Sequence, residues 1–484
     1  MSNDSSGPIW SQEFPAGVTR PGVGRRRFLA AAGWGLAAAG GAGIYHWFQQ
    51  AARVNGGGPV VPPRSQQTGP GKQLIFVFLT GGFSHLDTFD PKPLLWERQG
   101  KLASDVYPFP KLPIRFLGSP FAFSQQGESG LWMSDLFPEL GTVADQLCVL
   151  RGMYSPTKAH VQSALMMHSG SERIPLPSIG SWVSYGLGTL NPDLPSYVVF
   201  CEKEPYGGAQ IWDSGFLPRA NQGVRLEPGD HPIRNLVSTA PSQSLDELER
   251  QMLRDANELY ASARPGDFNL QARQKSFETG RGLMRVAPQV FDLAEETKET
   301  LDLYGIENDD NHSFGWQCLM ARRLIEQGVR TVELIESGQD ARFNWDSHDD
   351  ILTHVPRARA VDQALAALIK DLEQRSLLDR TVVAICTEFG RTPWFNDLKT
   401  RGRNHWSDAF TCLLAGGGVK RGFAYGETDD FGASVVAGQM HVRDYHATIL
   451  HLLGIDHRYL TYRYAGRDFR LTDIGGRIPR EILS

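Results

Sequence analysis

The sequence predicts an α/β protein with a mostly parallel sheet that carries helices on both faces. Three stretches, at 73–79, 331–335 and 381–385, are continuously apolar or β-branched over the length of one strand, as expected of strands buried on both faces. The stretch at 357–378, between the last two, places its apolar residues on one helical face. Strands that alternate with helices indicate parallel βαβ units. Further strands are expected at 146–153, 197–200 and 410–415, and further helices at 160–168, 314–328 and 443–455.

Composition excludes several classes of protein. The chain has 484 residues, 41% hydrophobic and 21% charged, so it can bury a large core. Its formal net charge is −5 and it carries no basic stripe beyond the N-terminus, so nucleic acid is not expected as a partner. The five cysteines lack CxxC spacing and lie among apolar residues. We interpret them as core residues, with neither a zinc site nor a disulfide framework.

The first 50 residues predict export. Arg25, Arg26 and Arg27 precede Phe28 and a weakly apolar, Ala/Gly-rich run, which is the arrangement of a bacterial twin-arginine signal. A basic tail before a buried helix is the alternative. The expected location is the periplasm or the cell envelope, and no clear A-x-A cleavage site follows, so membrane attachment through this segment stays open.

The rest of the chain divides into a linker and one domain. Residues 51–71 are rich in Gly, Pro, Ser and Gln and predict a flexible linker. The folded domain is expected over 72–484. Within it, apolar residues at helical spacing among charges predict a helical insertion around 244–300, packed on the sheet. The stretch at 177–223, dense in Pro, Gly and aromatic residues, is interpreted as loops on the substrate side.

Acids and histidines recur where predicted strands end, and ligands of α/β sheets collect at that edge. His85 and Asp87 follow the first strand, Asp346 and His348 follow 331–335, Glu388 and Arg391 follow 381–385, His405 precedes 410–415, and His160 begins a helix. Taken singly, each has a structural explanation: a self-capping turn for the pair at 85 and 87, or an ordinary ion pair for Glu388 with Arg391. Their joint placement predicts a hydrolase site with one or two metals.

The strongest local pair of metal ligands is Asp346 with His348. Both lie after a strand in a turn rich in acids, and carboxylate and imidazole donors suit zinc, manganese or a comparable divalent ion. The expected cofactor is therefore a divalent metal ion, whether zinc, manganese or calcium.

Several motifs carry a resemblance to known families. The order of segments resembles the alkaline phosphatase and sulfatase superfamily. GGFSHLDTFDPKP, WDSH, TEFGRTP, GRNHW and LLAGGGVKRG are similar to motifs of the bacterial domain-of-unknown-function family 1501, whose members commonly carry a twin-arginine leader. The similarity extends from about Lys72 to the C-terminus. It implies an alkaline-phosphatase-like core.

The superfamily site implies specific metal ligands here. Asp346, His348 and His405 resemble the residues that hold one metal. Glu388 stands where many relatives have an Asp for a second metal, whereas the adjacent Phe389 cannot bind one. The first strand ends in Thr-Gly-Gly in place of a metal-binding Asp, so His85 or Asp87 would have to substitute.

The position of the superfamily's nucleophile is the largest departure. By resemblance it falls on His160, with Ser163 one turn further along. Neither a formylglycine precursor nor an obvious phosphatase serine or threonine is there. His160 could be a metal ligand, a general base or a covalent nucleophile. Ser163, Thr157 and Ser155 are weaker candidates.

Together these features predict an exported metal-dependent hydrolase of sulfate or phosphate esters. Its substrate would be an anionic ester or a sulfated glycan, and Arg391 would offer a fork of donors to the anionic group. The competing hypothesis is a non-catalytic scaffold that binds a glycan or a cell-envelope partner. An isomerase or phosphotransferase on the same scaffold stays open.

Overall fold

The computed structural model describes residues 71–107, 114–233, 240–265, 267–307, 310–337, 344–395 and 400–484. The predicted twin-arginine signal and the predicted linker up to residue 70 lie outside the described residues. Among the helices that are described, none combines the length and the apolar character that a membrane crossing needs.

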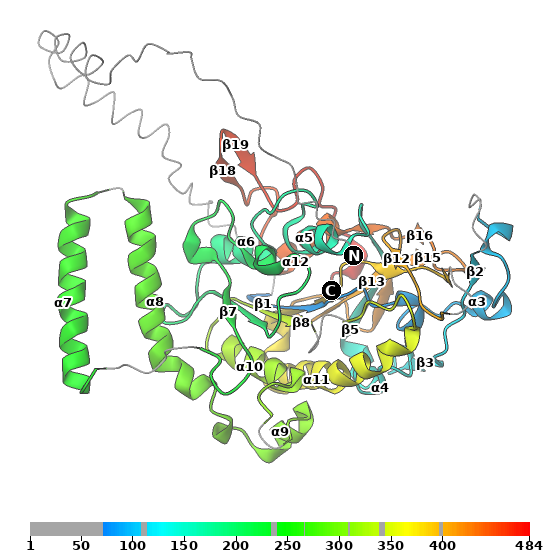
Figure 1. Cartoon of the computed structure of the whole chain (residues 1–484), viewed down its shortest axis with the longest axis horizontal. Coiled ribbons are helices and arrows are strands. Elements are labelled where there is room, and N and C mark those ends of the chain that lie inside the picture. The colour runs from blue at the N-terminus through cyan, green and yellow to red at the C-terminus, as the bar shows by residue number, and fades with distance from the viewer. Residues whose placement is uncertain are drawn as a thin grey trace, which may run out of the picture. The chain divides into compact units, whose positions relative to one another are not determined.

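A nine-stranded sheet forms the centre of the domain (Figure 1). Its strand order is β14-β5-β13-β9-β1-β8-β6-β7, with β17 paired to β5. The strands are β1 (Gln73–Leu79), β5 (Leu147–Tyr154), β6 (Tyr197–Cys201), β7 (Val224–Leu226), β8 (Thr331–Glu336), β9 (Thr381–Cys386), β13 (Phe410–Ala415), β14 (Phe423–Tyr425) and β17 (Met440–His441). All pairings are parallel except those of β13, which runs antiparallel to β5 and β9. The predicted mostly parallel α/β fold is confirmed.

Helices cover both faces of the sheet because its central strands are apolar on both sides. Along β1, Ile75, Val77 and Leu79 belong to one core and the alternate residues Leu74, Phe76 and Phe78 belong to the other. The first core includes α10 (Phe314–Glu326) and α11 (His354–Gln374). The second includes α5 (His160–Ser169), α6 (Ile179–Leu187) and α12 (Val442–Leu452). Figure 1 shows these two groups of helices on opposite sides of the sheet.

Local chemistry sets several helix boundaries. The Ser313 hydroxyl accepts a hydrogen bond from the Trp316 amide at the start of α10, at 3.1 Å. At the other end of a helix, Gly170 closes α5 with φ at 68°, a left-handed conformation that glycine adopts without steric cost. The five cysteines are buried and unpaired, in agreement with their interpretation as core residues.

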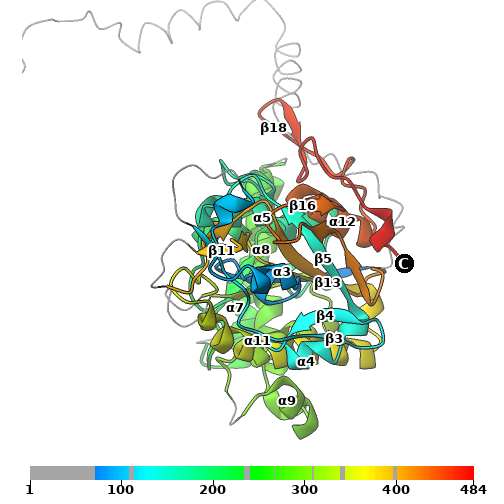
Figure 2. The same cartoon turned by 90° about the vertical axis from the view of Figure 1, so that its right-hand side faces the viewer.

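Smaller elements surround the sheet. They are the helices α3 (Pro93–Glu97), α4 (Pro138–Gly141) and α9 (Lys298–Tyr304), and the antiparallel pairs β2 (Arg115–Phe116) with β11 (Trp394–Phe395), β3 (Phe123–Gln126) with β4 (Leu131–Ser134), β10 (Gly390–Arg391) with β12 (His405–Trp406), β15 (Glu427–Thr428) with β16 (Val435–Ala437), and β18 (Tyr462–Tyr464) with β19 (Arg467–Phe469). Figure 2 shows β18 at the opposite end of the domain from α9.

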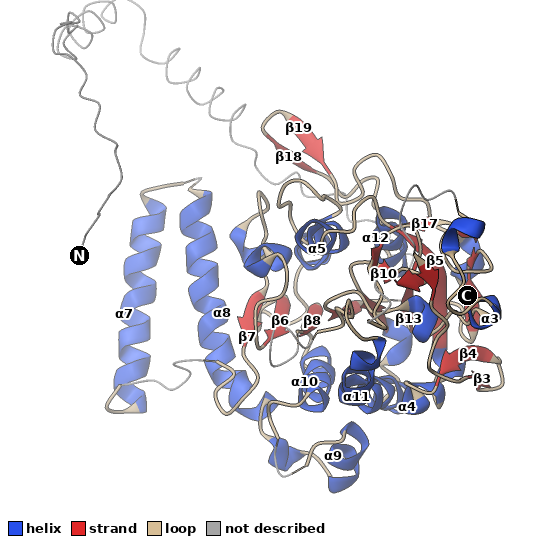
Figure 3. Ribbon diagram, turned by 45° about the vertical axis from the view of Figure 1, so that its right-hand side comes forward, coloured by secondary structure: helices blue, strands red, loops and turns tan. Residues whose placement is uncertain are grey.

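The charged helical region forms a hairpin of α7 (Gln243–Ser262) and α8 (Phe268–Val290). The C-terminal part of α8 is anchored in the core through Leu283, Ala287 and Val290. By contrast, α7 has no buried residue, and Figure 3 shows it on the far side of α8 from the sheet. The expectation that the insertion packs on the sheet therefore holds only for the end of α8 and is wrong for α7, since α8 separates α7 from the sheet.

Candidate active site

The chain segments that leave β1, β8 and β9 meet at one edge of the sheet. The three strands are parallel, with β1 paired to both of the others. Tight turns let these segments approach. A side chain at Gly81 would lie 2.7 Å from the backbone nitrogen of Asp346, and one at Gly82 would lie 2.5 Å from the ring of Phe389. The pair of glycines after β1 therefore makes room for the residues that follow β8 and β9.

Asp346 is the centre of the resulting cluster. Its Oδ1 is 3.3 Å from Nε2 of His405 and 3.3 Å from Nε2 of His348. Its Oδ2 is 3.3 Å from Nε2 of His160. Arg391 donates a 2.7 Å hydrogen bond to Oδ1. Among the described residues, His160, Asp346 and His405 each offer a ligand atom within 4.8 Å of the others. The structure thus brings together five residues that the sequence singled out.

His348 and His405 both present a bare nitrogen to the carboxylate of Asp346. Nδ1 of His348 lies 3.0 Å from the side-chain oxygen of Asn404, and Nδ1 of His405 lies 2.9 Å from the carbonyl oxygen of Lys158. Because these oxygens only accept hydrogen bonds, each Nδ1 carries the proton, and in the neutral ring Nε2 keeps a lone pair. The two Nε2 atoms are 2.8 Å apart. Two lone pairs and an anionic oxygen therefore face one point.

This donor set fits a divalent cation. Uncompensated, the facing lone pairs and the carboxylate repel one another, and a cation between them reverses the sign of that interaction. Ligands of a tetrahedral zinc ion, with bonds of about 2.1 Å, lie about 3.4 Å apart. The two nitrogen-to-carboxylate separations, at 3.3 Å, are close to this value, whereas the two nitrogens, at 2.8 Å, are closer together than a bound ion would hold them. Histidine ligands of metals usually donate their other ring N–H to a carbonyl or carboxylate oxygen, as His348 and His405 do.

Electrostatics keep the ligands in their metal-binding forms. Burial would raise the pKa of Asp346, but the neighbouring His160 and His405 rings and the charge of Arg391 hold that pKa far below its usual range. Burial lowers the pKa of His405 by more than the neighbouring Asp346 carboxylate raises it. The carboxylate is therefore ionised and the His405 ring is neutral.

His160 differs from the other two histidines because it lies between two carboxylates. Its Nδ1 is 2.8 Å from Oε1 of Glu388, and its Nε2 faces Asp346. Its ring stacks on Tyr206, with centroids 3.9 Å apart. Burial opposes its charged form, yet the hydrogen bonds to Asp346 and Glu388 raise the pKa of His160 overall. This imidazole is the one best suited to carry a proton.

Glu388 lies behind His160 and outside the cluster of donors around Asp346. Its Oε1 accepts hydrogen bonds from His160 Nδ1 and from the amide of Gly81, both at 2.8 Å. Its other oxygen accepts from the Thr387 hydroxyl at 3.0 Å. A ligand at Nε2 of His160 would therefore be on the opposite side of the ring from Glu388. This geometry differs from the expectation that Glu388 binds the metal directly.

Arg391 points its donors into the protein. Its Nε donates to the carbonyl of Gly82 at 2.8 Å, its Nη1 to that of Arg403 at 3.1 Å, and its Nη2 to that of Gly81 and to Asp346. The side chain is fully buried. The expectation of an arginine fork open to the substrate is therefore not met, because these acceptors already occupy the guanidinium. Its visible role is to hold Asp346.

His85 and Asp87 lie elsewhere. Arg403 donates two hydrogen bonds to the carboxylate of Asp87, at 2.7 and 3.2 Å, and the Ser84 hydroxyl adds a third. His85 is fully buried, with Nε2 2.9 Å from the carbonyl oxygen of Gly432. Both residues are buried, and the contacts described for them are with residues outside the cluster around Asp346.

Ser163 also points away from the cluster. It is buried, and its hydroxyl donates to the carbonyl of Thr157 at 2.9 Å. Sequence reasoning missed Asn404 and Tyr206, which orient and stack on the histidines. Asn404 adjoins His405 in the GRNHW motif, so its place was accessible from sequence. No spacing in the loop-rich stretch at 177–223 distinguishes Tyr206.

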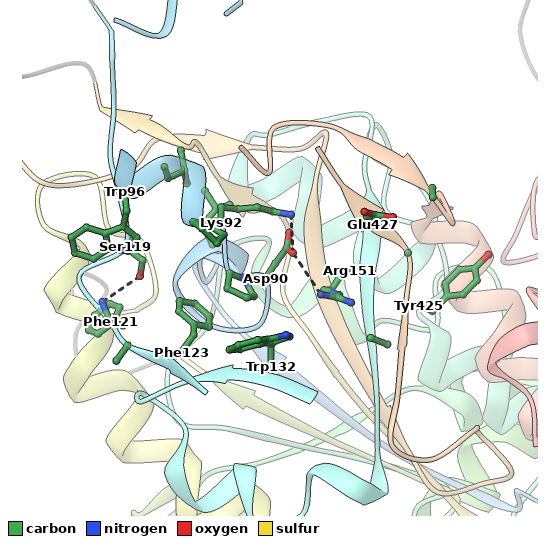
Figure 4. Close-up of a pocket in the computed structure, with 18 of the residues that line it drawn as sticks. Asp90, Lys92, Trp96, Ser119, Phe121, Phe123, Trp132, Arg151, Tyr425 and Glu427 are labelled. Carbon is green, nitrogen blue, oxygen red and sulfur yellow. Dashed lines mark hydrogen bonds and ion pairs between the residues drawn. The ribbon is translucent and has the colours of Figure 1, made fainter. Parts of the chain in front are cut away.

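A cavity of about 1140 Å³ opens away from the Asp346 cluster, between α3, β3, β4 and the end of β14. Figure 4 shows Asp90 with Lys92 and Arg151 on one side of it. The rings of Phe123 and Trp132 lie on its other side. Asp90 pairs with Lys92 at 3.1 Å and with Arg151 at 3.9 Å. None of the residues of the Asp346 cluster lines this cavity.

In open α/β sheets, ligands bind at the carboxyl edge of the parallel strands, and the carboxylate and histidines of this chain gather at that edge. The sequence profile described as "Protein of unknown function (DUF1501)" matches residues 71–483. The chain therefore belongs to the DUF1501 family, and the resemblance inferred from the motifs is confirmed. No curated protein matches the chain.

Three of the solved structures to which the chain is similar come from bacteria. A lipoteichoic acid synthase from Listeria monocytogenes has a TM-score of 0.36 and 12% identity, over 84% of this chain and 78% of that one. A sulfatase from Pseudoalteromonas sp. has a TM-score of 0.34 and 12% identity, over 80% and 68%. A protein in the alkaline phosphatase superfamily from Vibrio parahaemolyticus has a TM-score of 0.30 and 9% identity, over 84% and 78%.

Proposed function

We propose that the chain is a metal-dependent hydrolase of sulfate or phosphate esters, as the sequence predicts. One observation carries the proposal: Nε2 of His348, Nε2 of His405 and the carboxylate of Asp346 converge, while an acceptor oxygen faces Nδ1 on the far side of each ring. Two imidazole nitrogens and one carboxylate favour zinc over calcium, which prefers oxygen ligands only.

The three converging residues would hold the ion, which supplies Lewis acidity to an ester oxygen and lowers the pKa of a water molecule. An acceptor oxygen faces Nδ1 of each ring, from the Asn404 side chain at His348 and from the Lys158 carbonyl at His405, and this orients each Nε2 toward the ion. Arg391 holds Asp346 in place from the buried side.

His160 would move the proton. With its Nδ1–H held by Glu388, its Nε2 can accept a proton from the attacking water, and the Glu388 carboxylate stabilises the imidazolium that forms. The same nitrogen can then return the proton to the leaving alkoxide. Of the three roles that the sequence left open for His160, the general base agrees best with its position between two carboxylates.

Lys158 is the cation we assign to the anionic group of the substrate. Arg391 is fully buried, whereas Lys158 is exposed, and its carbonyl contacts His405. Its ammonium lies 5.5 Å from the centre of the Trp406 ring. An exposed ammonium, on a residue whose backbone contacts His405, can pair with a sulfate or phosphate oxygen without breaking an internal ion pair.

Metal analysis with a hydrolysis assay tests the proposal. The wild-type chain should contain a stoichiometric divalent metal and should hydrolyse members of a panel of chromogenic sulfate and phosphate esters. Asp346→Ala should lose both properties. His312→Gln, which changes an exposed histidine outside the cluster, is the matched control and should retain both. A wild-type chain that stays metal-free after incubation with each ion, or that is silent on every ester while loaded, contradicts the proposal.

A second candidate function, glycan binding, is favoured by the cavity in Figure 4. Trp96 and Trp132 line it with 56% and 43% of their surface exposed, a large apolar area for a soluble protein to leave uncovered. Indole faces stack on the C–H faces of sugar rings, and Asp90, Lys92 and Arg151 offer hydrogen bonds to hydroxyl or sulfate groups.

Affinity electrophoresis in gels that contain a neutral or a sulfated polysaccharide tests this second function. We expect retardation that Trp96→Ala and Trp132→Ala abolish and that Asp346→Ala leaves unchanged, because the two sites share no residue. Equal mobility in all gels contradicts glycan binding at this cavity.

A further inference from the structure

Helix α7 exposes an apolar stripe that nothing in the described structure covers. Leu245, Leu248, Met252 and Leu259 are exposed to 51%, 57%, 65% and 75%. Their spacing of three, four and seven residues places them on one face of the helix, in the pattern of a coiled-coil seam. Soluble chains rarely leave such a stripe in water, so it indicates a surface that is covered by a partner.

The hairpin is held to the domain at one end only. Leu283, Ala287 and Val290 bury the C-terminal part of α8, whereas no residue of α7 is buried. The contact between the two helices includes a 3.0 Å hydrogen bond from Gln274 to the carbonyl of Asn257. Even with α8 alongside, the stripe on α7 stays exposed, so α8 of the same chain is not what covers it. Figure 3 shows both helices side by side, clear of the sheet.

The two helices carry opposite charge. Helix α7 has five acidic residues against two basic ones, and α8 has four basic residues against one acidic. A second copy of the hairpin, related by a two-fold axis, would set each α7 against the α8 of the other chain and keep the two acidic helices diagonal. Such an arrangement is a four-helix bundle, in which apolar seams face inward and neighbouring helices attract.

We propose that the chain self-associates through the α7–α8 hairpin, with a second copy covering the stripe Leu245, Leu248, Met252 and Leu259. The charge pattern selects this partner over a lipid surface, because helices that lie on anionic membranes carry lysine and arginine opposite their apolar face, and α7 is acidic. It also selects a copy over an unrelated protein, since the complementary basic helix is part of the same hairpin. This inference is independent of the catalytic proposal.

Sedimentation velocity of the full chain across a range of concentrations tests the proposal. The wild type should be dimeric, and the double variant Leu248→Glu/Met252→Glu should dissociate at least about 100-fold more readily, because both copies lose two buried apolar side chains. Both positions are exposed in the single chain, so the fold should survive, and circular dichroism checks this. Ile474→Glu, at an apolar residue exposed to 87% outside the hairpin, is the matched control and should stay dimeric.

Charge reversal tests the arrangement of the helices. Glu249→Lys/Glu258→Lys on α7 and Arg273→Glu/Lys275→Glu on α8 should each weaken self-association, and an equimolar mixture of the two variants should associate again as a heterodimer. A monomeric wild type overturns the proposal, as does a dimer that the α7 variants do not weaken. Flotation with anionic vesicles that is lost in Leu248→Glu/Met252→Glu would assign the stripe to a membrane and would also overturn it.

Discussion

Asp87 and Asp346 are two carboxylates that follow buried strands of the same sheet, yet their surroundings differ in kind. Arg403 and Ser84 donate to Asp87 and balance its charge within the fully buried interior. Asp346 receives one hydrogen bond from Arg391 and otherwise faces the Nε2 atoms of histidines. Its side chain keeps 23% of its surface exposed.

The difference teaches how to tell a structural carboxylate from a functional one. At Asp87 every neighbour is a donor, so the group is satisfied and has no capacity for a ligand. At Asp346 the ring nitrogens of His348 and His405 turn lone pairs toward the carboxylate when these rings are neutral, so the group has capacity for a cation. The two aspartates are distinguished by whether the groups around them are hydrogen-bond donors or acceptors, because both follow a strand.

The substitution with the largest expected effect is Asp346→Ala. It removes the central ligand, so we expect bound metal to disappear and ester hydrolysis to fall by more than about 10⁴-fold. Elemental analysis and a steady-state assay measure the two effects. If metal content survives, Asp346 is not the site's central ligand and the contrast with Asp87 fails.

His160→Gln separates proton transfer from metal binding. We expect kcat to fall by about 10² to 10⁴-fold with the metal retained. The reason is that His160 contacts Oδ2 of Asp346, whereas His348 and His405 contact Oδ1. The measurement is kcat beside metal stoichiometry. Loss of the metal in this variant would instead make His160 a ligand.

Asp87→Asn should act on stability alone. It leaves the buried charge of Arg403 without a counterion, so the free energy of unfolding should fall by about 3–5 kcal/mol. Urea unfolding followed by circular dichroism measures the change. Metal content of the folded variant should match that of the wild type, and a variant that loses metal while its stability is unchanged would reverse the roles of the two aspartates.

Asn404→Ala is expected to have a smaller effect. It removes the oxygen that holds Nδ1–H of His348, so that ring can adopt the other tautomer or rotate. Metal affinity should weaken by about 10 to 100-fold, as measured by competition with a chelator. Gln439→Ala, at an exposed amide far along the chain, should leave the affinity unchanged.

The pH dependence of stability is the mildest test of the same contrast. Burial would raise the pKa of Asp87, but the charge and hydrogen bonds of Arg403 lower it below its unfolded value. The ion pair therefore stabilises the fold fully above about pH 4 and is lost as the pH falls toward the folded pKa. Asp87→Asn should show a shallower loss of stability over this acid range than the wild type. Parallel curves would contradict the assignment.

The sequence by itself determined the fold class, the main strands and helices, and the family. Continuous apolar runs such as 381–385 and helical stripes such as 357–378 are local patterns, and each specifies its element without knowledge of the rest of the chain. The sequence also placed Asp346, His348, His405 and His160 among the candidates. Those residue types at strand ends are visible without a structure.

Only the tertiary structure decided which candidates act together. Asp87 pairs with Arg403 across 316 positions of sequence, and His160 meets Asp346 across 186. The orientation of Glu388 behind His160 and the uncovered face of α7 likewise depend on what the fold places beside each residue. The charge of a carboxylate is set by neighbours within a few ångströms, and the sequence does not say which distant residues those neighbours are.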